Sequence, residues 1–176
     1  MRLPALLFAV TLVLGTTACS SSQAASTSAP RAPTTTAVPV RTMHWTNEGP
    51  PLTLLAPYCD PARHCVYPWT ERGTLHGDLE GSHVSAGVAA LDTTGKHYAV
   101  SRTDLFIGTV KGCGSGTIVI LGDENSTANG GAGTWEVARG KGTGALAHVT
   151  GHGTGTGTAD KRGIHSVLTG ALDCGR

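Results

Sequence analysis

The sequence predicts an all-β domain that folds as a closed barrel or a sandwich. Glycine accounts for 25 of the 176 residues, about twice its usual share. Glycines interrupt nearly every window between Thr42 and Arg176, and each costs about 1 kcal/mol inside a helix. Short β segments separated by turn residues remain, and their regular spacing is typical of barrels and sandwiches. A barrel also leaves no exposed sheet edge.

Eight segments have the composition and alternation of strands. The first is weak because prolines bound it, and the fifth holds the continuous aliphatic run from Ile118 to Leu121. The predicted strands are Leu52–Tyr58, Thr70–Glu80, Val84–Leu91, His97–Val110, Ser115–Gly122, Gly133–Ala138, Thr150–Thr158 and Ile164–Asp173.

Three connections carry specific expectations. The apolar positions change parity between Leu79 and Val84, which predicts a bulge or sharp bend near residues 81–82. Residues 123–131 are expected to form a polar loop, and residues 145–149 one helical turn. The alternating Gly and Thr of residues 153–158 suit a strand that is closely packed on one face.

The N-terminus has the pattern of a secretory signal peptide, predicted over residues 1–18. Arg2 precedes an apolar run that ends at Leu14 and is shorter than the roughly 20 residues needed to span a bilayer. Small residues and then Cys19 follow, an arrangement that resembles the lipobox of bacterial lipoproteins. This resemblance implies that Cys19 is lipidated and becomes the new N-terminus. Plain secretion, with cleavage near Ala18 or Ala25, is the alternative.

Residues 19–42 are rich in Ser, Thr, Ala and Pro and are predicted to form a flexible tether. Residues 43–176 then have the size of one domain. Charged residues make up 14% of the chain and the formal net charge is +1. With no basic run, the sequence argues against a nucleic-acid partner.

Four cysteines remain when Cys19 is set aside, and an even number in an exported chain indicates two disulfides with three possible pairings. We favour Cys59–Cys65 and Cys113–Cys174. Zinc sites usually use more closely spaced cysteines, so no metal site is predicted. His148 and His152 have metal-ligand spacing only on a continuous helix, which Gly151 opposes.

Charged residues at three positions are candidates for the interior of the barrel: Glu80, Arg102 and Asp104. The face of Glu80 lies opposite Leu75 and Leu79, which are the better core residues, so we favour solvent for this face and keep the interior as the alternative. Arg102 and Asp104 share a face and inside a barrel each would need its partner, although a pair on the outer face is commoner. No nucleophile elbow or phosphate loop is present, and no catalytic residue or cofactor is assigned.

Three segments between Thr74 and Cys174 resemble a bacterial family of uncharacterised proteins that share the allene oxide cyclase-like barrel. They are residues 77–81, residues 104–120 and, most specifically, residues 142–154. The resemblance implies an eight-stranded antiparallel β-barrel. The plant cyclase closes a ring in an unstable fatty-acid epoxide, but none of its catalytic groups is matched by a position here.

These observations lead to three functional hypotheses. The preferred one is a non-enzymatic barrel, held by lipid on the extracytoplasmic face of a bacterial membrane, that binds a small apolar ligand or another envelope component. The second is a cyclase or isomerase acting on a lipid-like substrate, with Glu80, Arg102 and Asp104 as the first candidates. The third is a purely structural surface protein. No oligomeric state is indicated.

Overall fold

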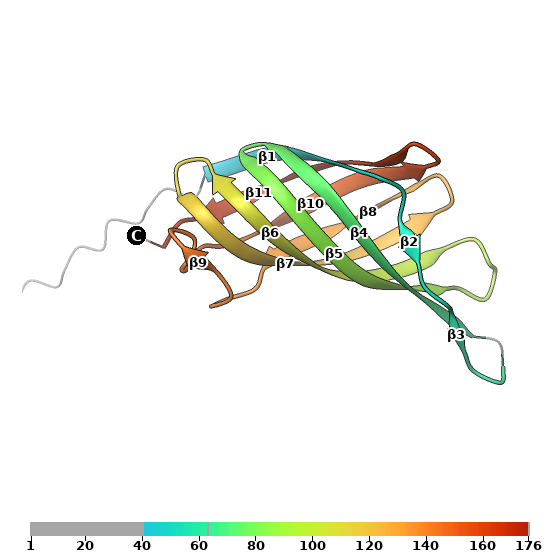
Figure 1. The fold of residues 1–176 in the computed structure, drawn as a ribbon. Coiled ribbons are helices and arrows are strands. Elements are labelled where there is room, and N and C mark those ends of the chain that lie inside the picture. The colour runs from blue at the N-terminus through green and yellow to red at the C-terminus, as the bar shows by residue number, and fades with distance from the viewer. Residues whose placement is uncertain (1–40, 63, 176) are drawn as a thin grey trace, which may run out of the picture. The chain divides into compact units, whose positions relative to one another are not determined.

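The computed structural model describes residues 41–62 and 64–175, which form a closed eight-stranded antiparallel β-barrel without helices (Figure 1). The barrel strands are β1 (Arg41–Gly49), β4 (Cys65–Gly77), β5 (Leu79–Leu91), β6 (Tyr98–Val110), β7 (Gly114–Thr127), β8 (Gly130–Val137), β10 (Thr150–Asp160) and β11 (Gly163–Asp173). Three two-residue strands flank them: β2 (Thr53–Leu54), β3 (Tyr58–Cys59) and β9 (Thr143–Gly144).

The sheet closes because β1 pairs with both β11 and β4. Trp45 lies opposite Leu168 on one side and opposite Gly77 on the other. The remaining barrel strands follow the order β11, β10, β8, β7, β6, β5, β4, so neighbours in the barrel are mostly neighbours in sequence. Every one of these pairs is antiparallel, which allows short turns to connect them.

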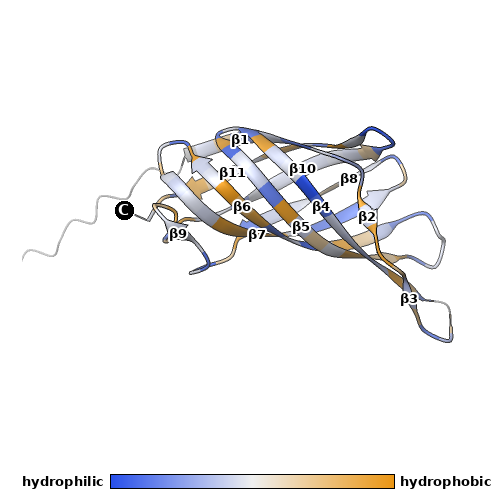
Figure 2. Ribbon diagram, viewed as in Figure 1, coloured by the Kyte–Doolittle hydropathy of each residue, from blue (hydrophilic) through white to orange (hydrophobic). Residues whose placement is uncertain are grey.

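Side chains alternate between the interior and the outer surface along each strand. Hydrophilic and hydrophobic residues are mixed along the strands (Figure 2). One end of the interior is filled by an apolar cluster that includes Met43, Trp45, Phe106, Leu146 and Leu172. Leu146 belongs to the segment between β8 and β10 and is fully buried. This segment therefore closes the end of the barrel at which β9 lies (Figure 1).

The glycines of β10 face the interior, while the threonines between them are exposed. The Trp135 ring occupies the space that this leaves, because a Cβ at Gly153 would lie 2.6 Å from its Cζ2 atom. Trp135 Nε1 donates hydrogen bonds to the carbonyls of Thr154 and Thr169, both at 3.2 Å. The Gly-Thr alternation thus makes room for a large aromatic residue, as the sequence predicted for one closely packed face.

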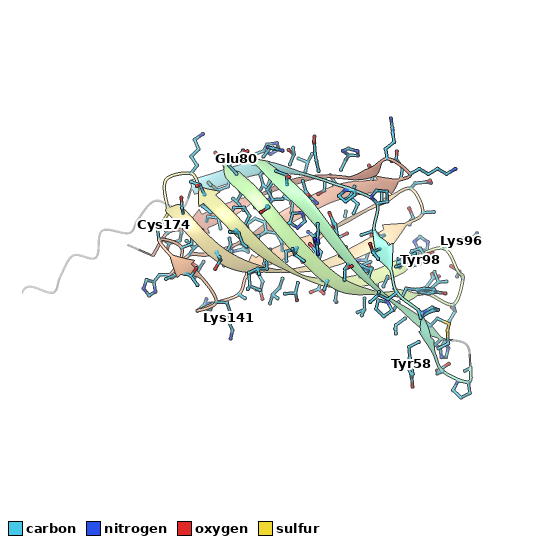
Figure 3. All side chains as sticks on the ribbon, in the orientation of Figure 1. Tyr58, Glu80, Lys96, Tyr98, Lys141 and Cys174 are labelled. Carbon is cyan, nitrogen blue, oxygen red and sulfur yellow. A yellow bond between two sulfur atoms is a disulfide. The ribbon has the colours of Figure 1, made fainter. Side chains whose placement is uncertain are left out.

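The two disulfides lie at opposite ends of the barrel, as the labelled Tyr58 and Cys174 show in Figure 3. Cys113–Cys174 joins the β6–β7 turn to the end of β11 beside the apolar cluster. Cys59–Cys65 closes the short loop between β3 and β4. Both pairs are those that the sequence analysis favoured.

The expected first strand is wrong. Residues 52–58 contain only the short pairings of β2 and part of β3, and the strand that completes the barrel is β1. It begins at Arg41, inside the segment expected to be tether. The alternation of β1 is hard to recognise in the sequence because a polar residue, Asn47, takes the buried position that follows Met43 and Trp45 on the same face. The predicted signal peptide, Cys19 and most of the predicted tether lie outside the described residues.

Three smaller expectations are also corrected. The β5 ladders run without an extra residue from Leu79 to Leu91, so no bulge is present near residues 81–82. Polar residues 123–127 continue β7 instead of forming a loop. Residues 145–149 make successive turns with hydrogen bonds such as Val149 N to Leu146 O, 3.2 Å, and no helix. Within residues 41–62 and 64–175, no helix is long and apolar enough to cross a membrane.

Candidate functional site

A cavity of about 410 Å³ occupies the end of the barrel opposite the apolar cluster. It lies among the ends of β4 to β8, β10 and β11, and residues 52 and 54 from the β1–β4 connection lie at its edge. The lining includes four aromatic rings, those of Tyr67, Trp69, Tyr98 and Trp135. The volume falls within the range of about 300–1,000 Å³ that is typical of ligand pockets.

The glycine-rich strands widen this end of the barrel. Gly131 and Gly133 of β8 and Gly155 and Gly157 of β10 all line the cavity. Larger residues at these interior positions would fill an eight-stranded barrel with side chains, whereas glycines leave space for one small molecule. The cavity therefore follows from the same composition that predicted the fold.

A chain of buried polar side chains crosses the barrel between the cavity and the apolar cluster. Glu71 Oε1 accepts a hydrogen bond from Asn47 Nδ2 at 3.0 Å. Asn47 Oδ1 lies 2.8 Å from His83 Nε2, and His83 Nδ1 lies 3.0 Å from Ser85 Oγ. Since Asn47 Oδ1 accepts, His83 Nε2 carries a proton in this arrangement, which leaves Nδ1 as the acceptor from Ser85 when the ring is neutral.

A charged group on β6 and β7 completes this polar layer. Arg102 Nε lies 3.2 Å from Glu124 Oε1 and 3.7 Å from Asp104 Oδ2. The position of the guanidinium depends on Gly122, because a Cβ there would lie 2.7 Å from Arg102 Nε. Glu71, Arg102 and Glu124 line the cavity, so its floor is ionisable while its wall is aromatic.

Burial shifts the pKa values of two groups in the layer in opposite directions. Burial raises the pKa of Glu71, and the charges of Asp104 and Glu124 add to this, while Asn47 and Arg102 oppose it. Burial lowers the pKa of His83, against the influence of Asp104. Both shifts favour the neutral forms. A carboxyl group and an imidazole thus lie together with Glu71 Oε1 and His83 Nε2 3.8 Å apart.

The layer contains buried polar atoms without hydrogen-bond partners among the described residues, and the donor Arg102 Nε is one of them. Asp104 Oδ1 is buried and has no hydrogen-bond partner among the described residues. Glu71 has a side chain 2% exposed, and within the part of the chain that the structure covers its Oε2 atom receives no hydrogen bond. Buried polar atoms are usually hydrogen-bonded, so these oxygens mark a place where a ligand or water can donate.

Comparisons with known proteins give a match in sequence and a match in structure. A family described as a protein of unknown function, DUF3224, matches residues 66–168. The chain belongs to this DUF3224 family. Among solved structures, a DUF3224 protein of unknown function from Shewanella oneidensis MR-1 is similar, with a TM-score of 0.59 and 15% identity over 77% of this chain and 99% of that one. A likeness at this identity shows the fold alone. No curated protein matches the chain.

The DUF3224 match begins in β4 and ends in β11, so it contains the cavity floor but not β1. Glu71, His83, Arg102, Asp104 and Glu124 fall inside the matched residues. Asn47, which joins Glu71 to His83, precedes them, and each disulfide has at least one cysteine outside them.

The structure of this DUF3224 chain brings two of the three charged candidates into the interior. Arg102 and Asp104 face inward on β6, where they form an ion pair. Glu80 lies on the outer surface, the placement favoured from the sequence, and the alternative of an interior position is wrong (Figure 3). Its neighbours Leu79 and Gly81 alternate inward, and Glu80 instead contacts His76 Nδ1 at 3.0 Å in solvent.

Four residues of this site were not predicted from the sequence: Asn47, Glu71, His83 and Glu124. A signal existed for Glu71, since it shares a strand face with Leu75, a residue assigned to the core. His83 could have been found in the same way from Leu79, had the outward Val84 not been taken to mark a change of face. In the described ranges, no group of three or more His, Cys, Asp and Glu side chains is placed to hold a metal ion.

Proposed function

We propose that the protein is an extracytoplasmic binding module that holds a small, largely apolar molecule in the mouth of its barrel. The cavity of about 410 Å³ with its aromatic lining is the observation that carries this proposal. Apolar pockets with a few polar groups are the usual form of small-molecule sites. The allene oxide cyclase-like resemblance fits a ligand of lipid-like character, and we extend it to this chain as part of the same proposal.

The binding proposal is tested with N-phenyl-1-naphthylamine, an apolar dye whose fluorescence rises on transfer out of water. We expect saturable binding to the protein and its loss in Val100→Trp, because Val100 lines the cavity and a larger ring fills it. Val84→Trp adds the same ring to the outer face of β5, where Val84 is exposed, and is expected to bind as the wild type does. Absence of saturable binding, or equal binding by both variants, contradicts the proposal.

The extracytoplasmic location is proposed from the cysteines and the N-terminus together. Disulfides persist in oxidising compartments, and this domain contains two of them. We propose that lipid on Cys19 anchors the chain to the outer face of the cytoplasmic membrane. In a bacterial host the wild type is then expected in the membrane fraction, carrying an added acyl mass, while Cys19→Ala appears in soluble form. Equal membrane association of both forms contradicts the anchor.

A second function, isomerisation or ring closure of the bound molecule, is favoured by one observation. Glu71 and His83 lie together with Arg102 and Asp104, and the pKa of Glu71 is raised by burial while that of His83 is lowered by burial. Shifted pairs of this kind are typical of acid–base sites. Mass spectrometry of the molecule recovered from wild type and from Glu71→Gln separates the functions. Different covalent structures support an enzyme, whereas identical ones support binding alone.

A further inference from the structure

The polar floor of the cavity carries excess negative charge. Two carboxylates, those of Asp104 and Glu124, lie beside one guanidinium, that of Arg102, and Glu71 adds a third whenever it is ionised. His83 adds little positive charge at neutral pH, because burial lowers its pKa. The other elements packed around Glu71 present Asn47 from β1 and Ser85 from β5, which are uncharged.

The charges at this floor disfavour the binding of an anionic ligand. The Arg102 guanidinium is the cation that could receive it. Its Nε atom makes no hydrogen bond among the described residues, but it lies within 3.7 Å of the carboxylates of both Asp104 and Glu124. An added carboxylate at Arg102 would also approach these two like charges. Like charges in a poorly solvated site repel strongly.

A cationic ligand meets the opposite situation. Glu71 Oε2 accepts no hydrogen bond among the described residues although the side chain is 98% buried and lines the cavity, so it offers an N–H donor an oxygen with no competing partner. Glu124 lines the same space. The indole rings of Trp69 and Trp135 and the phenol rings of Tyr67 and Tyr98 form the wall, and aromatic rings of these types attract cations.

From this arrangement we infer that the ligand of the mouth cavity is an amphipathic amine, whose protonated nitrogen lies at Glu71 and Glu124 and whose apolar body contacts the aromatic wall. This inference rests on the proposed binding function and names the chemical class of the ligand. The ammonium group supplies a positive charge against the excess of carboxylates and an N–H donor for Glu71 Oε2. It also favours the ionised form of Glu71, so binding weakens as the pH falls and Glu71 takes up a proton.

The test compares three probes with one apolar chain: octylammonium, octanol and octanoate. Two of the three tryptophans of the chain line the cavity, so intrinsic fluorescence reports binding. At pH 7.5 we expect octylammonium to bind about tenfold more tightly than octanol, a difference of about 1.4 kcal/mol, with octanoate weakest.

Three glutamate variants locate the nitrogen. Glu71→Gln and Glu124→Gln are each expected to weaken octylammonium about tenfold while leaving octanol unchanged, because each removes one carboxylate charge near the nitrogen. Glu71→Gln keeps an oxygen that can accept the hydrogen bond from Asn47 Nδ2. The Glu124 side chain is 28% exposed, so Glu124→Gln tests the inference even if Glu71→Gln unfolds. Glu136→Gln removes the same charge from the outer face, where Glu136 is exposed, and serves as the matched control.

The outcomes distinguish this inference from the function on which it rests. Equal binding of all three probes, or tightest binding of octanoate, overturns the amine while the binding function stands. Failure of octylammonium to bind a protein that binds N-phenyl-1-naphthylamine overturns it in the same way. Failure of the dye and of all three probes overturns both proposals.

Discussion

The two ends of the barrel differ in what fills them. At the end closed by the segment before β10, Phe106, Ile118 and Leu146 are fully buried and the Cys113–Cys174 disulfide lies beside them. At the other end, glycines, two buried tryptophans and two partly exposed tyrosines surround a cavity, and Leu54 at its edge is 65% exposed. The barrel strands run through both ends, so the difference arises from their side-chain volumes and from the segment around Leu146 that fills one end, and it separates a stabilising region from a binding region.

The strongest test of this comparison is a pair of truncations. Phe106→Ala removes a fully buried ring from the closed end and is expected to lower the free energy of unfolding by about 3–5 kcal/mol. Leu54→Ala at the mouth is expected to change it by about 0.5 kcal/mol or less, since the side chain is largely in solvent. Urea unfolding measures both. Similar losses in the two variants would show that the mouth stabilises the fold as much as the core does.

The disulfides give a second comparison of the two ends. On the chain-entropy relation, the separation of 61 residues between Cys113 and Cys174 corresponds to about 4 kcal/mol and the separation of 6 between Cys59 and Cys65 to about 2 kcal/mol. The double variant Cys113→Ala/Cys174→Ala should therefore lower the midpoint of urea unfolding more than Cys59→Ala/Cys65→Ala does. The reverse order contradicts a stabilising role for the closed end.

The polar layer between the two ends is tested at Asn47. Asn47→Ala removes the donor to Glu71 and the acceptor of His83, and buried groups left without partners cost about 1–3 kcal/mol. The control is Thr46→Ala, which changes the preceding residue on the opposite face of β1 and is expected to have little effect on the free energy of unfolding. Equal unfolding free energies for the two variants would mean that the layer contributes nothing to stability.

Sequence patterns predicted the features that depend on backbone and composition. Glycine content and turn residues indicated an all-β barrel or sandwich, the family resemblance implied the eight-stranded barrel, and the even number of cysteines indicated two disulfides. Arg102 and Asp104 were recognised as a pair because they are two residues apart on one strand face. In each case the informative residues either are close together in the chain or are informative by their number, so that their positions in the fold need not be known.

The polar layer escaped prediction because its members are buried only when strands distant in sequence meet. Asn47 and His83 are 36 residues apart, and Asn47 and Glu71 are 24 apart. A polar residue at an interior position also breaks the alternation from which strands are recognised. On β5 the outward Val84 was more apolar than the inward His83, so the pattern indicated the opposite face.

The smallest expected effect is a pH dependence of the unfolding free energy that Glu71 causes. Glu71 lines the cavity, so this dependence belongs to the hollow end of the barrel and not to the apolar cluster. Because burial raises the pKa of Glu71, the folded protein keeps this proton at pH values where the unfolded chain has lost it. The wild type therefore loses stability relative to Glu71→Gln as the pH rises from the ordinary value of 4.5 through the folded pKa. Urea midpoints of both proteins between about pH 4 and 8 measure the difference. Glu136→Gln should show no such trend, and a wild type that gains stability over Glu71→Gln with rising pH would mean that Glu71 is ionised in the fold and its charge is already matched.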